Sequence, residues 1–206
     1  MIRVLALLTL IGLTGCTPDD PVGLGDTGAT PGGGPGPGPG PTTDVDPTLP
    51  VVTSSTPCAA CGGDCLVEEL WYPGRYHDPM PIEYTVRPPA GGPHNPCWAT
   101  FGVHAEPVPD DNWVHNLEHG AVVYLYACGD APCPDEIAQL TALADARGEL
   151  TLVTPYDEMD VRFAAVAWQV RMLTGCVDAA AFDAFWDERV DQAPESVASD
   201  PSTACM

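Results

Sequence analysis

The feature that most constrains the fold is an apolar run that directly follows a histidine-rich segment. Residues 121–126 (AVVYLY) lack polar alternation, a pattern typical of a strand buried on both faces. Before them, residues 114–120 (VHNLEHG) predict a short helix, capped by Asp110 or Asp111 and ended by Gly120. In such a helix His115 and His119 lie on one face, with Glu118 beside them. A rigid strand would therefore fix two imidazoles and a carboxylate in place.

Later segments carry clear helix and strand signals. Pro134 at a first helical position and Gly148 at an end predict a helix between them, and residues 149–153 predict a strand. Residues 161–173 favour a strand through Trp168, and residues 82–86 alternate as a short strand would. Asp178 should cap a last helix, with Phe182, Phe185, Trp186 and Val190 facing inward. We expect an α+β fold, a single compact domain whose small sheet packs with two or three helices.

The N-terminus has the pattern of an export signal. Residues 1–15 place one arginine before an apolar stretch too short to span a membrane as a mature helix. The ending Leu-Thr-Gly-Cys16 resembles a bacterial lipoprotein signal, which implies a lipid anchor on Cys16 and a location in the cell envelope. Thr17 after the cysteine favours the outer membrane. An ordinary signal peptide, cut nearby and leaving Cys16 free, is the alternative.

Composition separates a linker from the folded domain. Residues 16–57 are rich in proline and glycine and cannot bury enough apolar surface to offset their ordering entropy. We expect a disordered tether there, followed by a disulfide-stabilised domain over residues 58–206. The chain has no lysine, and 7 arginines against 29 acids give a net charge of −22. That charge argues against nucleic acid or anionic lipid surfaces as partners and leaves any protein partner unidentified.

The cysteine count favours disulfides. Apart from Cys16, the chain has an even number of cysteines, which in an exported protein suggests a disulfide framework: Cys58, Cys61, Cys65, Cys97, Cys128, Cys133, Cys176 and Cys205. Pairs 128–133 and 176–205 are plausible bridges, although sequence does not fix the connectivity. The 58–61–65 cluster could instead be a redox or metal motif, but no strand precedes it, so structural disulfides are the preferred interpretation.

Several motifs together resemble a known family. They are Gly74-Arg75-Tyr76-His77, Tyr84, residues 88–94 (PPAGGPH), residues 114–120 and Ala167-Trp168. This set is similar to the bacterial envelope proteins grouped as domain of unknown function 3105. Gly91, Gln169 and His104 depart from the family pattern. The resemblance implies the fold and an envelope location, and it carries no function.

The histidines allow three hypotheses. In the preferred one, His77, His94, His115 and His119 converge on Cu or Zn, with His104 or Glu118 nearby, because imidazole suits both metals. The prolines and glycines of residues 88–94 would form a rigid loop that mounts His94.

In the second hypothesis, residues 115–119 fit the H-x-x-E-H pattern of a zinc hydrolase, with Glu118 as general base and Glu188 or Glu195 completing the site. In the third, the histidines and Glu118 form a hydrogen-bond network that pins the proline loop to the central strand of a partner-binding domain. Gly120 ends the helix too early for the hydrolase pattern, so an enzyme is not favoured.

Overall fold

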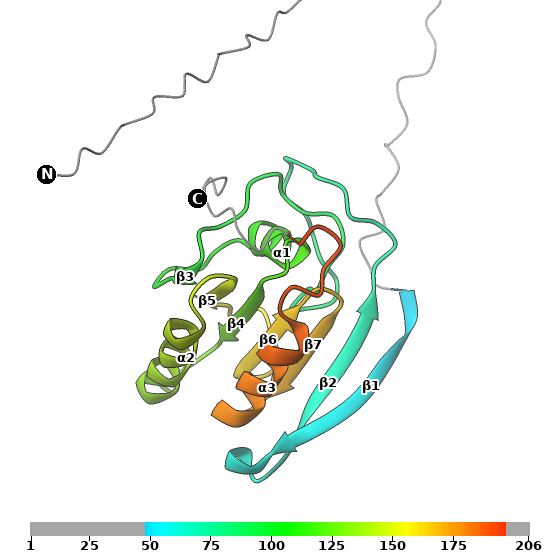
Figure 1. The fold of residues 1–206 in the computed structure, drawn as a ribbon. Coiled ribbons are helices and arrows are strands. Elements are labelled where there is room, and N and C mark those ends of the chain that lie inside the picture. The colour runs from blue at the N-terminus through cyan, green and yellow to red at the C-terminus, as the bar shows by residue number, and fades with distance from the viewer. Residues whose placement is uncertain (1–47, 197–206) are drawn as a thin grey trace, which may run out of the picture. The chain divides into compact units, whose positions relative to one another are not determined.

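A computed structural model of the protein describes residues 48–196 (Figure 1). The predicted signal peptide, Cys16, most of the predicted linker and Cys205 lie outside these residues. The described residues form one seven-stranded sheet with three α-helices, so the α+β prediction is confirmed. The first strand, β1, spans Thr48–Cys58 and overlaps the end of the predicted linker over residues 16–57. None of the described helices combines the length and apolar character needed to cross a membrane.

The sheet mixes antiparallel and parallel strands in the order β1-β2-β7-β6-β4-β5-β3. After β1, the strands are β2 (Gly63–Trp71), β3 (Gly102–Val103), β4 (Val122–Tyr126), β5 (Thr151–Pro155), β6 (Phe163–Ala167) and β7 (Val170–Thr174). Strand β5 runs parallel to β3 and β4, and every other pairing is antiparallel. The strand predicted from the apolar run, β4, therefore lies inside the sheet between β6 and β5.

The two faces of the sheet carry separate cores. Val122 and Tyr124 pack with helices α2 (Pro134–Arg147) and α3 (Ala179–Arg189), which Figure 1 shows across one face. Val123 and Leu125 point to the other face, where they join helix α1 (Asp110–Glu118) and the loops around it. Each fully buried side chain of this size stabilises the fold by roughly 1.5–3 kcal/mol. Strand β4 is thus buried on both faces, as its sequence predicted.

Helix α2 begins and ends at its predicted signals, and helix α3 begins at its predicted cap, Asp178. Pro134 occupies the first turn of α2, and Gly148 follows its last residue with a φ of 73°. The Asp178 side chain accepts hydrogen bonds from the backbone N–H groups of Ala180 and Ala181, both at 3.1 Å. These local signals were sufficient to locate the helix ends, because each one satisfies or removes a backbone group that would otherwise be unpaired there.

Two strand predictions were wrong. Residues 82–86 form no strand, because Tyr84 is held by its side chain, whose hydroxyl donates to the Pro93 carbonyl at 2.6 Å. Residues 161–173 form two strands, β6 and β7, joined by a turn at Trp168 and Gln169. Gln169 has a φ of 62° there, and its N–H donates to the Ala90 carbonyl at 2.6 Å. Contacts outside each segment decide its structure, nine residues away for Tyr84 and 79 residues away for Gln169.

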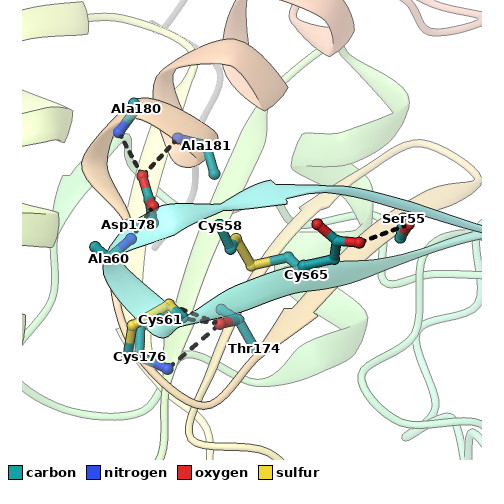
Figure 2. The surroundings of a disulfide bond; sticks show 11 residues. Ser55, Cys58, Ala60, Cys61, Cys65, Thr174, Cys176, Asp178, Ala180 and Ala181 are labelled. Atoms are coloured by element: carbon teal, nitrogen blue, oxygen red, sulfur yellow. Dashed lines mark hydrogen bonds between the residues drawn. A yellow bond between two sulfur atoms is a disulfide. The ribbon is translucent and has the colours of Figure 1, made fainter.

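Disulfides lie within the β1–β2 hairpin, between this hairpin and the segment just before α3, and between β4 and α2. Three bridges, shown in part in Figure 2, join Cys58 to Cys65, Cys61 to Cys176, and Cys128 to Cys133. Cys97 is also disulfide-bonded. The predicted 128–133 pair is confirmed, whereas the 176–205 pair is wrong.

The pairing of Cys61 with Cys176 has a local cause. The 3-10 turn between β1 and β2 (Ala59–Cys61) lies against Asp178, whose carboxylate accepts from Ala60 N at 2.8 Å (Figure 2). This contact brings Cys61 to Cys176. The three clustered cysteines at 58, 61 and 65 are therefore structural disulfide partners and not metal thiolates.

Candidate metal centre

Three segments that lie far apart in the sequence bring metal-ligating side chains together. His77 comes from the loop after β2, His94 from the proline loop, and His115 and Glu118 from α1. One ligand atom of each of these four residues lies within 4.8 Å of the other three. This group is called the His/Glu cluster below.

The three imidazoles of the cluster form a nearly equilateral triangle. Their ring centroids are 4.8 Å (His77–His94), 4.7 Å (His77–His115) and 4.8 Å (His94–His115) apart. Nε2 of His77 lies 3.4 Å from Nε2 of His115, and Glu118 Oε2 lies 2.8 Å from His94 Nε2 and 3.9 Å from His77 Nε2. Around a tetrahedral zinc with Zn–N bonds near 2.0–2.1 Å, ligand atoms are about 3.3 Å apart. The three distances between ligand atoms above differ from that spacing by about 0.6 Å or less, and all four ligand atoms lie within 4.8 Å of one another.

Backbone pairing fixes the two loop histidines relative to each other. His94 N donates to the Tyr76 carbonyl at 3.1 Å, and Asp78 N donates to the His94 carbonyl at 2.8 Å. The two bonds form an isolated parallel bridge between His77 and His94. The proline loop also needs Gly92, whose φ is +98° and whose added Cβ would lie 3.0 Å from the Tyr72 ring. The loop is therefore held rigidly beside β2.

Helix α1 supplies the other two ligands from one face. His115 and Glu118 are three residues apart, so their side chains lie on adjacent positions of the helix surface. The predicted cap is wrong: Pro109 is the N-cap and offers no side-chain hydrogen bond, while Asp110 and Asp111 lie in the first turn. Carboxylates in the first turn still favour the positive end of the helix dipole. Gly120 follows the helix with a φ of +91°, as predicted.

Hydrogen bonds to backbone carbonyls fix the tautomers of two histidines. His94 Nδ1 lies 2.9 Å from the Gly92 carbonyl oxygen, and His115 Nδ1 lies 2.7 Å from that of Asn95. A carbonyl oxygen only accepts, so each Nδ1 carries the proton and donates. In a neutral imidazole, Nε2 then presents a lone pair. Metal-ligating histidines in proteins use this same arrangement.

The two oxygens of the Glu118 carboxylate face different partners, a guanidinium and the imidazoles. Its Oε1 accepts from Arg75 Nη1 at 3.2 Å, and the same Arg75 atom donates to Glu195 Oε1 at 2.9 Å. The other oxygen, Oε2, faces the histidines. Arg75 thus orients Glu118 as a second-layer residue orients a metal ligand.

The electrostatics keep His115 and Glu118 in the forms that bind metal. Burial, followed by the nearby His94, lowers the pKa of His115 to about 4, so its ring is neutral at physiological pH. Burial opposes ionisation of Glu118, whereas the Arg75 guanidinium at 3.2 Å favours it, and the pKa of that carboxyl is lowered. Neutral imidazole and ionised carboxylate are the ligand forms that a cation requires.

Two buried atoms of the cluster lack a hydrogen-bond partner among the described residues: His94 Nε2 and Glu118 Oε2. They are 2.8 Å apart, but their orientation is not that of a hydrogen bond. His94 is 0% exposed, and the Glu118 side chain is 1% exposed. Leaving such groups unsatisfied costs about 1–3 kcal/mol each. A cation bound between them would satisfy both.

Of the four residues of the cluster, His77 is the exposed one. The His77 side chain is 46% exposed, whereas His94, His115 and Glu118 are buried. An ion would reach the cluster past His77.

The remaining two histidines lie outside the cluster. The His119 ring stacks on His115 with centroids 4.7 Å apart, as the predicted shared face requires, but its Nδ1 donates to the Glu195 carbonyl at 2.9 Å. His104 Nε2 lies 2.8 Å from the Thr100 carbonyl oxygen. The structure thus joins three of the four predicted ligands with Glu118 in place of His119.

Two residues that support the cluster, Arg75 and Asn116, had no predicted role. Arg75 orients Glu118, and Asn116 bonds both backbone groups of Ala99 at 3.0 and 2.8 Å, which anchors the segment after the proline loop to α1. Both residues stand inside motifs noted from the sequence. Their positions in those motifs were the available signal.

Fold and cluster together define an α+β protein with a centre of three histidines and one glutamate on a rigid scaffold. The chain belongs to a family described as protein of unknown function (DUF3105), whose model matches residues 77–202. That match includes all four residues of the His/Glu cluster. No curated protein and no solved structure matches the chain.

Proposed function

We propose that this protein binds one transition metal ion, Zn or Cu, through His77, His94, His115 and Glu118. The observation that carries the proposal is the convergence of four ligand atoms within 4.8 Å of one another. The Nδ1–carbonyl bonds of His94 and His115 support it, because they aim a lone pair of each ring into the cluster.

The donor set favours Zn²⁺ or Cu²⁺ over other ions. Imidazole nitrogen suits both metals, and the cluster contains no thiolate that would select Cu(I). Four protein donors near a tetrahedral spacing are typical of zinc, while the general affinity order favours copper where it is available.

We further propose that the domain works as a lipid-anchored protein of the bacterial cell envelope, in the outer membrane. The lipoprotein-like ending at Cys16 motivates this location, and disulfides that persist outside the cytoplasm are consistent with export. Mass spectrometry of the native protein should find the mature chain beginning at a lipidated Cys16. A mature N-terminus elsewhere, with unmodified Cys16, would refute the anchor.

The geometry favours metal binding over hydrolysis by the H-x-x-E-H segment. In that pattern the two histidines hold the metal and the glutamate is free to act as base. Here His119 lies outside the group of converging donors, and Glu118 inside it. The glutamate is also paired with Arg75 at 3.2 Å.

Metal content measured on purified protein tests the proposal. Protein secreted into an oxidising compartment is loaded with Zn²⁺ or Cu²⁺, dialysed, and analysed by mass spectrometry for ions per chain. We expect one ion per chain, retained by the His104→Ala and His119→Ala variants and lost in His94→Ala and His115→Ala. His104 is the matched control, since it is a histidine bonded to a backbone carbonyl outside the cluster.

Circular dichroism checks that each variant is folded. Loss of the ion in His119→Ala with retention in His77→Ala would refute the proposed ligand set. A folded wild type that takes up no ion under either loading condition would contradict metal binding. These residues would then form a structural hydrogen-bond network.

A further inference from the structure

Two adjoining hollows mark the surface beside the β6–β7 turn. One has a volume of about 650 Å³ and extends along the chain after β2 and the segment after α3. The other has a volume of about 390 Å³ and lies over the ends of β2 and β7. Trp71, Trp168 and Gln169 line both hollows. The two hollows are therefore parts of one elongated groove, called the tryptophan groove below.

Aromatic side chains form the middle of this groove, and one of them is unusually exposed. Trp71 is 57% exposed, although an indole is among the side chains that gain most from burial. Trp168 is half-buried. A Cβ atom added to Gly91 would lie 3.7 Å from the Trp168 ring and 3.1 Å from the Tyr72 ring, so the backbone of the proline loop packs closely against both rings. The Trp168 ring also packs edge-on against His94, with centroids 6.3 Å apart. The groove thus has one half-buried aromatic wall, Trp168, and a more exposed one, Trp71.

The charges of the groove are balanced, in contrast to the chain as a whole. The charged residues that line the larger hollow are Arg75 and Asp191, and those of the smaller are Glu69 and Arg189, so each sums to zero. Two of the 7 arginines of a chain with net charge −22 thus lie here. Arg75 is already paired with Glu118 and Glu195, and Arg189 lies 3.7 Å from Glu69. An anionic ligand would therefore find both arginines of the groove already paired with carboxylates.

We propose that the tryptophan groove binds a neutral oligosaccharide. The apolar C–H face of a sugar ring stacks on an indole, and its hydroxyls pair with donors and acceptors such as Gln169, Gln192 and Asp191. Ligand sites commonly combine aromatic walls with a few placed polar groups in this way. An elongated groove with indoles at its centre suits several sugar units in a row. The proposal needs no metal in the His/Glu cluster.

Titration of the full-length protein with soluble neutral sugars tests the proposal. Chitohexaose and cellohexaose are the probes, and NMR shifts of the indole N–H groups of the chain's 5 tryptophans are the readout. We expect at least one probe to shift the Trp71 and Trp168 signals and to saturate below about 10 mM. Trp71→Ala should weaken binding at least tenfold, and Trp71→Phe should retain part of it. Tyr76→Ala is the control, because Tyr76 is 41% exposed but does not line the groove.

Four outcomes would overturn the proposal. They are the absence of shifts at either indole with both probes, equal affinity in Trp71→Ala and wild type, and tighter binding of a polygalacturonate hexamer or of an extended Gly/Ser peptide. The fourth is self-association that buries Trp71 in the wild type and is abolished by Trp71→Ala. Because Trp71 is largely exposed, the variants should remain folded, which thermal unfolding checks.

Discussion

Replacing His115 by asparagine should remove a specific part of the protein's acid sensitivity. The His115 pKa is lowered to about 4, chiefly by burial, from an ordinary value of 6.5. The unfolded chain therefore binds a proton between pH 6.5 and 4 that the folded chain does not, so stability falls as pH falls through this window. The difference of about 2.5 pKa units corresponds to about 3 kcal/mol at 1.36 kcal/mol per unit. Above pH 6.5 this stability is fully present, and below pH 4 it has been lost.

The assay is urea unfolding of wild type and His115→Asn, with chelator present, from pH 7.5 to pH 4. Asparagine keeps a donor near Nδ1 for the Asn95 carbonyl, which lies 2.7 Å from that atom, but it does not titrate. We expect the free energy of unfolding of the wild type to fall more steeply, by a difference that grows to about 3 kcal/mol at pH 4. Parallel curves for the two proteins, or an NMR titration of His115 near 6.5, would refute the reasoning.

Three further predictions concern the scaffold. Arg75→Gln removes the cation that orients the ligand carboxylate and should weaken metal binding about 10–100-fold by calorimetry, without unfolding the domain. Gly120→Ala should destabilise the fold by about 1–3 kcal/mol in urea, because φ is +91° and the new methyl would lie 2.9 Å from a backbone Cα; an unchanged midpoint would contradict this. Replacing Cys61 and Cys176 by serine should cost about 5 kcal/mol and replacing Cys128 and Cys133 about 2 kcal/mol, since the bridges close loops of 115 and 5 residues. Equal losses in calorimetric melts would argue against the loop-entropy explanation.

Local signals in the sequence predicted the elements that depend on local physics. Strand β4 is readable because an unbroken apolar run needs cover on both sides. Helices α2 and α3 are readable because Pro134, Gly148 and Asp178 act on backbone groups within one turn. The α+β class follows from these elements alone.

The errors arose where distant contacts decide the backbone. Alternating burial over residues 82–86 looks like a strand, but it reflects the anchoring of Tyr84 to Pro93. The turn at Gln169 has neither glycine nor asparagine at its φ of 62°, and bonds to Ala90 and from Leu70 hold it. Pro93 lies nine residues after Tyr84, outside the alternating segment, and Ala90 and Leu70 lie 79 and 99 residues before Gln169.

The types of residue in the candidate site were predictable from the sequence, but the exact set of converging residues was not. His77, His94 and His115 were predicted to converge, and their ring centroids lie within 4.8 Å of one another. On α1, positions three and four residues beyond His115 both share its face. Only the placement of the proline loop and of Arg75 decides that Glu118, and not His119, faces the other imidazoles.

The order of strands in the sheet has a consequence for how the chain matures during synthesis. Strand β2 is made early, yet its inner neighbour is β7, about a hundred residues later, and Cys61 must wait for Cys176. Pairings between remote segments form slowly, and an unpaired edge is exposed meanwhile. The first hairpin therefore pairs with the rest of the sheet, and forms its disulfide to Cys176, only when nearly the whole domain has emerged. A domain truncated before residue 170 should be degraded or aggregate, even though every histidine of the cluster has already been made.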